Sequence, residues 1–215
     1  DDVDTVSPRL AVDPARGGTA TLELDAGCHE VSLVAAQPLA GFYASMWTRS
    51  GLERDRIEGG ARGTLFTCQA GKERLRLEVG TVGPPGAVAV LKRPLADPPS
   101  ALLRAPRAGS RLVQFTRGQM PNEASVVRLV PGRRTPVSLP LEADACFEFA
   151  AALDGDPQGL ELRLLGADGA SLVRRRGWAV VGEPVCRKGS VRTLRLALTV
   201  DTAPTAAVVG FRRLD

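Results

Sequence analysis

The sequence predicts an all-β protein made of two tandem antiparallel β-sandwich domains with a jelly-roll-like arrangement of strands. Two observations support this fold class. Apolar and polar residues alternate over short runs bounded by Gly, Pro, Ser and Asp, which is typical of strands and not of helices. The second half also repeats the glycine and cysteine pattern of the first, which indicates a duplication. We therefore expect a first domain with an N-terminal leader over 1–98, and a basic connector with a second domain over 99–215.

Each half contains about seven alternating runs that we interpret as strands. The first set covers residues 19–24, 30–35, 42–47, 52–57, 64–67, 73–79 and 87–91. The second set covers residues 136–141, 147–152, 160–165, 171–175, 179–181, 193–199 and 206–211. Immunoglobulin topology is disfavoured, because Tyr43 is the only tyrosine and each domain would need its own tyrosine corner. Both tryptophans, Trp47 and Trp178, are expected to pack in the core or at a sheet edge.

The glycines support the duplication independently of the apolar residues. When Cys28 is placed on Cys146, Gly51 falls on Gly169 and other glycines also coincide. Because glycine marks tight turns and close backbone approaches, matched glycines indicate matched turns. Ser50-Gly51 and Asp168-Gly169 each separate two strand runs, and a small polar residue followed by glycine is a hairpin signal. The runs that flank each of these turns are therefore expected to pair.

The four cysteines form two pairs with the same internal spacing, Cys28 with Cys68 and Cys146 with Cys186. A zinc site is disfavoured, because the cysteines are widely separated and His29 is the single histidine. Four cysteines allow three pairings, and the duplication favours one disulfide inside each domain. Disulfides persist in oxidising compartments, so we expect the periplasm, the cell surface or the medium. Two pairs of buried free thiols are the alternative.

The net charge of +4 comes from the segment between the two predicted domains. Its arginines include Arg104, Arg107, Arg111 and Arg117, which are a candidate partner-binding surface for an acidic molecule. The preferred interpretation is a solvated interdomain connector. Nucleic acid is disfavoured, since Phe115 is the only aromatic residue there and base stacking needs several. A second basic cluster, Arg174, Arg175 and Arg176, lies on a predicted strand, where it is a further candidate binding site or a guard against edge aggregation.

The sequence contains no catalytic or metal-binding motif, so we expect a non-enzyme without a cofactor or metal. His29 is replaced by Phe147 at the equivalent position, which argues against a catalytic role. Asp154 and Asp156 are spaced for calcium, but a polar turn is the preferred interpretation. Asp1, Asp2 and Asp4 are expected in a flexible leader or a tether near a membrane anchor. No run is apolar enough for a transmembrane helix.

The order of these features resembles the bacterial pre-peptidase C-terminal domain family. The resemblance rests on GCHEVSLVA at 27–35, RSGLE at 49–53 and ERLRLEV at 73–79, and a looser copy of the pattern follows in the second half. It implies jelly-roll-like sandwiches of secreted or surface proteins that are usually not catalytic themselves. These 215 residues contain no peptidase motif, so we expect no protease-accessory role, and they lack the more acidic motifs of the family. A lysine-poor, arginine-rich composition is typical of G+C-rich coding sequences and favours a bacterial source.

These features predict a non-catalytic periplasmic or extracellular binding and assembly protein, with a protein or polysaccharide of the cell envelope as its partner. The alternative is a structural subunit or lipoprotein of a larger surface complex. A hydrolase with an unrecognised pair of carboxylates is the third hypothesis.

Overall fold

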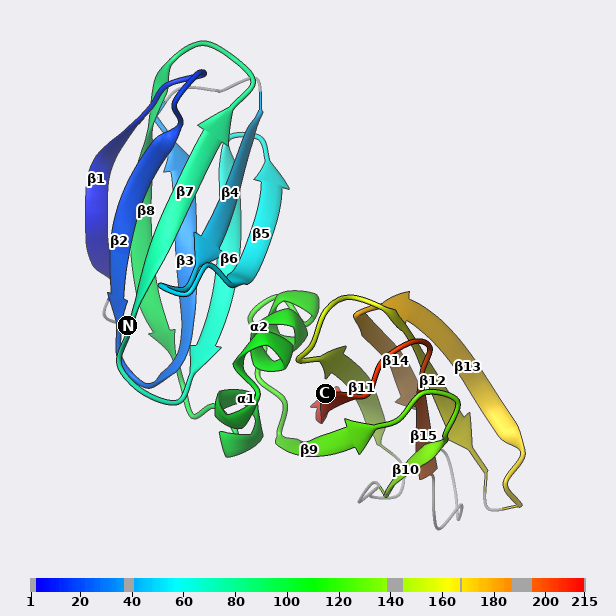
Figure 1. Cartoon of the computed structure of the whole chain (residues 1–215). Coiled ribbons are helices and arrows are strands. Elements are labelled where there is room, and N and C mark those ends of the chain that lie inside the picture. The colour runs from blue at the N-terminus through cyan, green and yellow to red at the C-terminus, as the bar shows by residue number, and fades with distance from the viewer. Residues whose placement is uncertain (1–2, 37–40, 139–144, 167, 187–194, 215) are drawn as a thin grey trace. The chain divides into compact units, whose positions relative to one another are not determined.

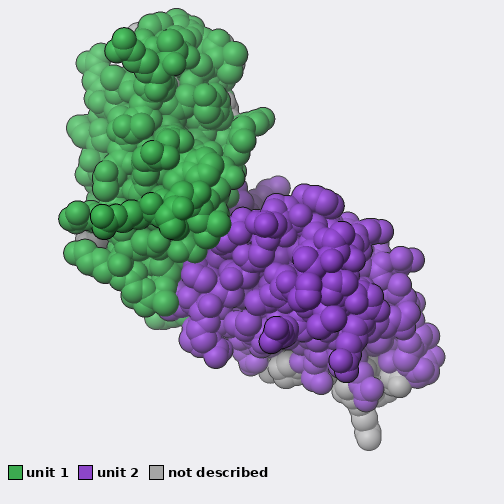
Figure 2. Space-filling view, viewed as in Figure 1, with its two compact units in different colours: residues 1–98 green, residues 99–215 purple. Residues whose placement is uncertain are grey.

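The computed structural model describes residues 3–36, 41–138, 145–166, 168–186 and 195–214. The chain divides into two compact units, Asp1–Pro98 (unit 1) and Pro99–Asp215 (unit 2), which are coloured separately in Figure 2. Each unit contains two four-stranded antiparallel sheets (Figure 1). The predicted all-β fold of two sandwich-like halves is confirmed.

Unit 1 has the strand order of a jelly roll. Its sheets run β1-β8-β3-β6 and β2-β7-β4-β5. The pairs β4–β5, β3–β6, β2–β7 and β1–β8 are nested around one turn, as in a long hairpin that has rolled up into two layers. The strands are β1 Asp4–Val12, β2 Gly18–Leu24, β3 Gly27–Ala35, β4 Phe42–Trp47, β5 Glu53–Gly59, β6 Arg62–Gln69, β7 Glu73–Thr81 and β8 Gly86–Leu95.

Unit 2 repeats this topology strand for strand. Its sheets run β14-β11-β16-β9 and β10-β15-β12-β13, so that β9 to β16 correspond in order to β1 to β8. The strands are β9 Glu123–Leu129, β10 Thr135–Ser138, β11 Cys146–Leu153, β12 Gly159–Leu165, β13 Ser171–Trp178, β14 Val180–Cys186, β15 Arg195–Val200 and β16 Thr205–Leu214. The parts of the predicted strands at 139–141 and 193–194 lie outside the described residues.

Each unit has its own core between its two sheets, because alternate residues of every strand point inward. In unit 1 the largest fully buried side chains include Leu22, Leu33 and Met46. In unit 2, Phe149 lies at the centre, with Phe147 and Phe211 at ring-centroid distances of 6.2 and 6.3 Å. These aromatic contacts strengthen the unit 2 core beyond the burial of area alone.

Both predicted hairpins are confirmed. β4 pairs with β5 and β12 with β13, and each pair has an irregular register next to its turn. Gly51 and Gly169 both have φ of +80°, a conformation that suits glycine. The equivalent glycines therefore mark equivalent turns.

The expectation that Asp4 belongs to a flexible leader is wrong, because β1 begins at this residue and pairs with β8. The register of β1 shifts between Thr5 and Ser7, and again between Ser7 and Leu10. Pro8 lies in the second shift, at the edge of the sheet, where the missing N–H of proline does not interrupt a central ladder. The equivalent edge strand β9 was also not predicted. Asp1 and Asp2 lie outside the described residues.

The expectation of a solvated connector is wrong as well. Residues after Pro99 form the helices α1 Ser100–Arg104 and α2 Pro106–Phe115, which belong to unit 2. α2 covers the outer face of the sheet β14-β11-β16-β9, where a Cβ on Gly182 would overlap the Phe115 ring and a Cβ on Gly210 would crowd Leu112. Small residues on this sheet thus leave room for the helix. Neither helix in the described part of the chain is long and apolar enough to cross a membrane.

Both predicted disulfides are confirmed, one in each unit. Cys28 lies directly opposite Cys68 on β3 and β6, and Cys146 lies opposite Cys186 on β11 and β14. The two bridges therefore join equivalent strands. Their surroundings differ, because Cys28 and Cys68 are buried whereas Cys186 is exposed.

Candidate functional site

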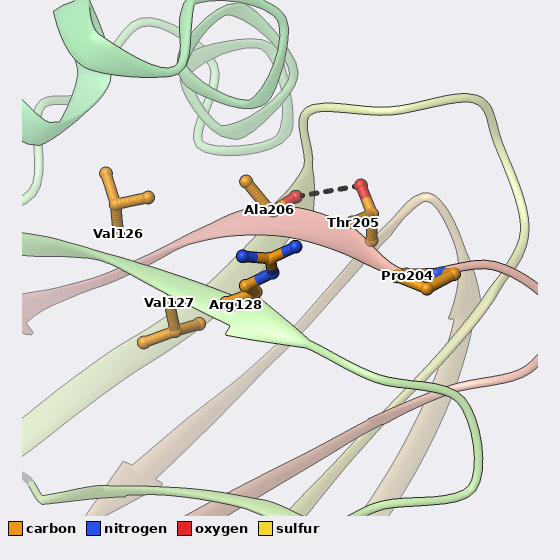
Figure 3. Close-up of a pocket in the computed structure, with 6 residues that line it drawn as sticks. All are labelled: Val126, Val127, Arg128, Pro204, Thr205 and Ala206. Atoms are coloured by element: carbon orange, nitrogen blue, oxygen red, sulfur yellow. Dashed lines mark hydrogen bonds between the residues drawn. The ribbon is translucent and has the colours of Figure 1, made fainter.

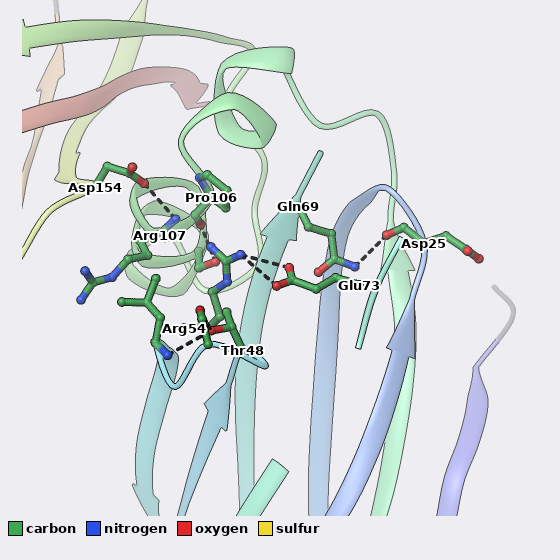
Figure 4. Close-up of polar contacts among 11 residues, drawn as sticks. Asp25, Thr48, Arg54, Gln69, Glu73, Pro106, Arg107 and Asp154 are labelled. Atoms are coloured by element: carbon green, nitrogen blue, oxygen red, sulfur yellow. Dashed lines mark hydrogen bonds and ion pairs between the residues drawn. The ribbon is translucent and has the colours of Figure 1, made fainter. Parts of the chain in front are cut away.

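The carboxylate of Asp154 caps the start of α2. Its Oδ1 atom accepts hydrogen bonds from the backbone N–H groups of Arg107 at 3.0 Å and Ala108 at 3.1 Å (Figure 4 draws the first). A helix start leaves such N–H groups without partners, and its dipole favours a negative charge nearby. The segment at Asp154 is thus a polar turn whose carboxylate caps α2, and the capped N–H groups lie 46 and 47 residues earlier in the sequence.

Two of the candidate connector arginines bind this same turn. Arg107 Nη1 lies 3.3 Å from Asp156 Oδ1, and Arg111 Nη1 donates to the carbonyl oxygens of Leu153 at 2.6 Å and Gly155 at 2.8 Å. Arg104 and Arg117 are exposed. Arg107 and Arg111 thus attach α2 to the rest of unit 2 through intramolecular contacts. Because Arg104 and Arg117 are exposed instead, the four arginines do not form one uniform binding surface.

The second candidate cluster divides between the two sides of β13. Arg175 forms a two-pronged ion pair with Glu183 on β14, at 2.5 and 2.9 Å. Arg174 and Arg176 point to the outer face of the sheet, where Arg174 Nε lies 2.6 Å from Glu161 Oε2 and Arg176 pairs with Asp201. Consecutive arginine side chains therefore point to opposite sides of β13, because side chains alternate along a strand.

Glu161 is a buried carboxylate on this outer face. Burial would raise the pKa of the Glu161 carboxyl, but the hydrogen bonds and charges of Arg163 and Arg174 outweigh burial and lower it. Glu161 is therefore ionised and holds two arginines in place. It does not have the raised pKa that a general acid needs.

Trp178 lies at the end of β13 on the same outer face, and 71% of it is exposed. The expectation that both tryptophans pack is therefore wrong for Trp178, whereas Trp47 is half-buried. Trp178 is directly opposite Gly159 on β12, and a Cβ at position 159 would overlap the carboxylate of Asp201. The Arg176–Asp201 pair thus occupies the space above Gly159, on the sheet face that also carries Trp178. We call this group of residues, Trp178, Arg176 and Asp201, the tryptophan site.

Unit 1 exposes an aromatic residue on its equivalent sheet. Tyr43 on β4 is 45% exposed and lies opposite Gly80 on β7. A Cβ at position 80 would overlap the Tyr43 ring, so the ring rests on the backbone of Gly80. Farther along this sheet, a groove of about 770 Å³ lies beside the β4–β5 turn; its lining includes Thr21, Ser50 and Arg76. The sequence signal that could have found both sites is an aromatic residue at an outward position opposite a glycine.

Two further polar features, a groove and the acidic and metal-ligating side chains of the described residues, show no arrangement typical of a catalytic site. A groove of about 480 Å³ at the β9–β16 edge (Figure 3) is lined by six described residues that include no carboxylate, histidine or cysteine. Among the residues the structure describes, no group of three or more His, Cys, Asp or Glu side chains could hold a metal ion. No constellation for nucleophilic or acid–base chemistry is present at these places.

His29 is buried at the start of β3. Its Nε2 donates to the backbone carbonyl oxygen of Asp25 at 2.9 Å, and the same oxygen accepts from Gln69 Nε2 at 2.8 Å (Figure 4 draws the second). Burial lowers the pKa of His29 and outweighs the opposing effect of the hydrogen bond to Asp25. The neutral imidazole is thus part of the core of unit 1.

The lowered pKa of His29 predicts an acid-sensitive stability for unit 1. The unfolded chain takes up the proton near pH 6.5, whereas the folded chain takes it up only at lower pH. The free energy of unfolding is therefore expected to be largest above pH 6.5 and to fall as the pH decreases toward the folded pKa. Denaturant titrations over this range measure the effect. The variant His29→Phe, which introduces the residue that unit 2 has at Phe147, should lose this part of the pH dependence, and an unchanged pH profile would contradict the assignment.

No family model matches this sequence, and no curated protein matches it. Among solved structures, the chain is similar to the tandem CBM22-1–CBM22-2 domains of Xyn10C from Paenibacillus barcinonensis, at 12% identity and a TM-score of 0.30, covering 99% of this chain and 91% of that one. It is also similar to the PBSX exported protein XepA, at 9% identity and a TM-score of 0.32, covering 99% and 86%. A third is the turret protein A223 of Sulfolobus turreted icosahedral virus, at 12% identity and a TM-score of 0.28, covering 100% of both chains. At these scores the similarities carry no argument about function.

Proposed function

We propose that this chain is a non-catalytic binding protein of the periplasm, cell surface or extracellular medium, and that its two jelly rolls bind polysaccharide. The observation that carries the proposal is the exposed indole of Trp178 on the sheet face that also carries the Arg176–Asp201 pair. An aromatic residue with most of its surface in solvent makes little contribution to its own core, which favours an intermolecular role.

Sugar rings suit this chemistry. One face of a pyranose presents C–H groups, which pack on an aromatic ring. Its hydroxyl groups accept hydrogen bonds from a guanidinium group and donate hydrogen bonds to a carboxylate. Trp178, Arg176 and Asp201 supply these three functions on one face of the sheet. Tyr43 supplies the aromatic part on the equivalent sheet of unit 1, with threonine and serine hydroxyls in the groove farther along the same face.

The two disulfides support the proposed location. Each bridge is formed between directly opposed residues and is stable only where thiols become oxidised. A chain that folds outside the cytoplasm meets the polysaccharides of the cell envelope there.

Affinity electrophoresis in gels that contain a polysaccharide tests the proposal. Trp178→Ala and Tyr43→Ala are each expected to weaken retention about tenfold, the loss typical of an important aromatic contact. Val82→Ala is the control, because Val82 is 84% exposed and lies outside the two sheet faces. Wild-type retention by both aromatic variants would contradict the proposal. If envelope proteins alone retain the chain, and neither aromatic variant changes this, the structural-subunit alternative is favoured.

A further inference from the structure

On the outer face of the sheet β10-β15-β12-β13, three successive cross-strand residue pairs beyond Trp178 each contain an arginine. We refer to each such pair as a level of the sheet. Strand register places Arg176 opposite Glu161, Arg174 opposite Arg163, and Arg195 opposite Leu165. Residues two apart on a strand are separated by about 7 Å, so each level follows the last at this interval. We call these four arginines, Arg163, Arg174, Arg176 and Arg195, the arginine face.

The carboxylates of this face do not balance its arginines. Arg163 and Arg174 share the single carboxylate of Glu161, and Arg176 pairs with Asp201. Arg195 adds a further exposed positive charge. Because the pKa of Glu161 is lowered, its carboxylate is charged and contributes one of the negative charges of this face. Among the described residues of these strands and of the turn at Asp201, four positive charges thus stand against two negative ones.

The equivalent face of unit 1 has no such excess among its paired groups. Three arginines on its strands pair with glutamates of the same face: Arg56 with Glu58, Arg74 with Glu23, and Arg76 with Glu78. The two units share a fold and an exposed aromatic residue, but on the described strands the aromatic residue is combined with surplus positive charge in unit 2 and with balanced ion pairs in unit 1. This difference points to a different ligand charge at the two faces.

We infer that the arginine face binds an acidic polysaccharide, with Trp178 stacking on a sugar ring and the arginines pairing with carboxylate or sulfate groups along the polymer. This inference rests on the proposed polysaccharide-binding function and adds the charge of the ligand. Guanidinium groups form two parallel hydrogen bonds with such anions. Successive levels about 7 Å apart, with arginines contributed by β12, β13 and β15, suit a polymer whose charges repeat.

Nucleic acid is also a repeating polyanion, but this face is less suited to it. Trp178 is the only aromatic side chain at the outward positions of β12, β13 and β15 in the described residues, and single-stranded nucleic acid needs several stacking platforms. We therefore treat nucleic acid binding as an outcome that would overturn the inference.

The experiment compares the affinity of the whole chain for polygalacturonate, dextran sulfate, neutral dextran and a single-stranded oligonucleotide by isothermal titration calorimetry. We expect at least tenfold tighter binding to one or both acidic polymers than to neutral dextran, and an affinity that falls with added salt. Polygalacturonate and dextran sulfate distinguish carboxylate from sulfate recognition. Equal affinity for neutral dextran, or tighter binding to the oligonucleotide, would overturn the inference.

Arg175 provides a matched control for Arg176. Both variants, Arg176→Ala and Arg175→Ala, remove one positive charge and break one ion pair on the same strand, but Arg175 reaches Glu183 on the other side of β13. We expect Arg176→Ala to weaken binding to the acidic polymer about fivefold or more, and Arg175→Ala to change it less than about twofold. Equal losses would overturn the assignment to this face. If Trp178-dependent binding occurs without charge preference, the proposed function stands and this inference fails, whereas absence of all polysaccharide binding ends both.

Discussion

Replacing Cys28 and Cys68 together with alanine is expected to lower the free energy of unfolding of unit 1 by about 4 kcal/mol. The bridge closes a loop with a sequence separation of 40 residues, which contains the whole β4–β5 hairpin. Without it, the unfolded chain regains the entropy that this closure removes. Because each unit has its own core, the transition of unit 2 should stay in place. Denaturant unfolding of the variant, followed by hydrogen exchange in each unit, measures the loss.

The double variant of Cys146 and Cys186 is the matched control, and it should destabilise unit 2 by a similar amount because its loop has the same length. The two bridges should differ in their response to a reductant. Thiol attack requires access, and Cys186 is exposed while Cys28 and Cys68 are buried. Partial reduction followed by alkylation and mass spectrometry should label unit 2 first. Simultaneous loss of both unfolding transitions in either variant would contradict the independence of the units.

Replacing Asp154 with alanine is expected to destabilise unit 2 by about 2 kcal/mol, because the start of α2 then loses its cap. Both N–H groups that bind Oδ1 would lose their acceptor, and the negative charge at the helix start would disappear. The loss should loosen the helix before the rest of the unit unfolds. Hydrogen exchange of the α2 amides, measured with the overall free energy of unfolding, tests both effects.

Asp156→Ala is the control for this prediction, since it removes the same charge two residues away. The Asp156 side chain is 95% exposed and contacts Arg107 at 3.3 Å, which is a weak surface pair. We expect a change of less than about 0.5 kcal/mol and unaltered exchange of α2. Equal destabilisation by the two variants would show that charge alone, and not the cap, stabilises the helix.

The local pattern predicted the strands and hairpins that obey simple alternation. β4 begins and ends where the alternating run does, and the glycines after Ser50 and Asp168 mark its turn and the equivalent one. Prediction failed where the local pattern was interrupted. The edge strand β1 was not predicted because it contains Pro8, and proline is rare within strands. Here Pro8 lies at a register shift of an edge strand, where it is tolerated.

The helices were missed for a different reason. Leu102, Ala105, Ala108 and Leu112 are buried and recur with roughly helical spacing, a signal that was present between two strand-rich halves. What makes α2 stable, however, is not local. Its cap comes from Asp154, its side chains fit above Gly182 and Gly210, and these residues lie far away in the sequence.

By itself, the sequence determined the duplication, the β-sandwich class and the pairing of the cysteines. Turns and alternation can be recognised locally, and repeated spacing can be recognised by comparing the two halves of the chain. Only the tertiary structure decided what each charged or aromatic side chain does. Arg107 and Arg111 bind the turn that begins at Asp154, Arg175 reaches a neighbouring strand, and Arg176 lies on the same sheet face as the exposed Trp178. The physical reason is that an ion pair or an exposed ring depends on which strands become neighbours, and the rolled topology brings together residues that no local pattern connects.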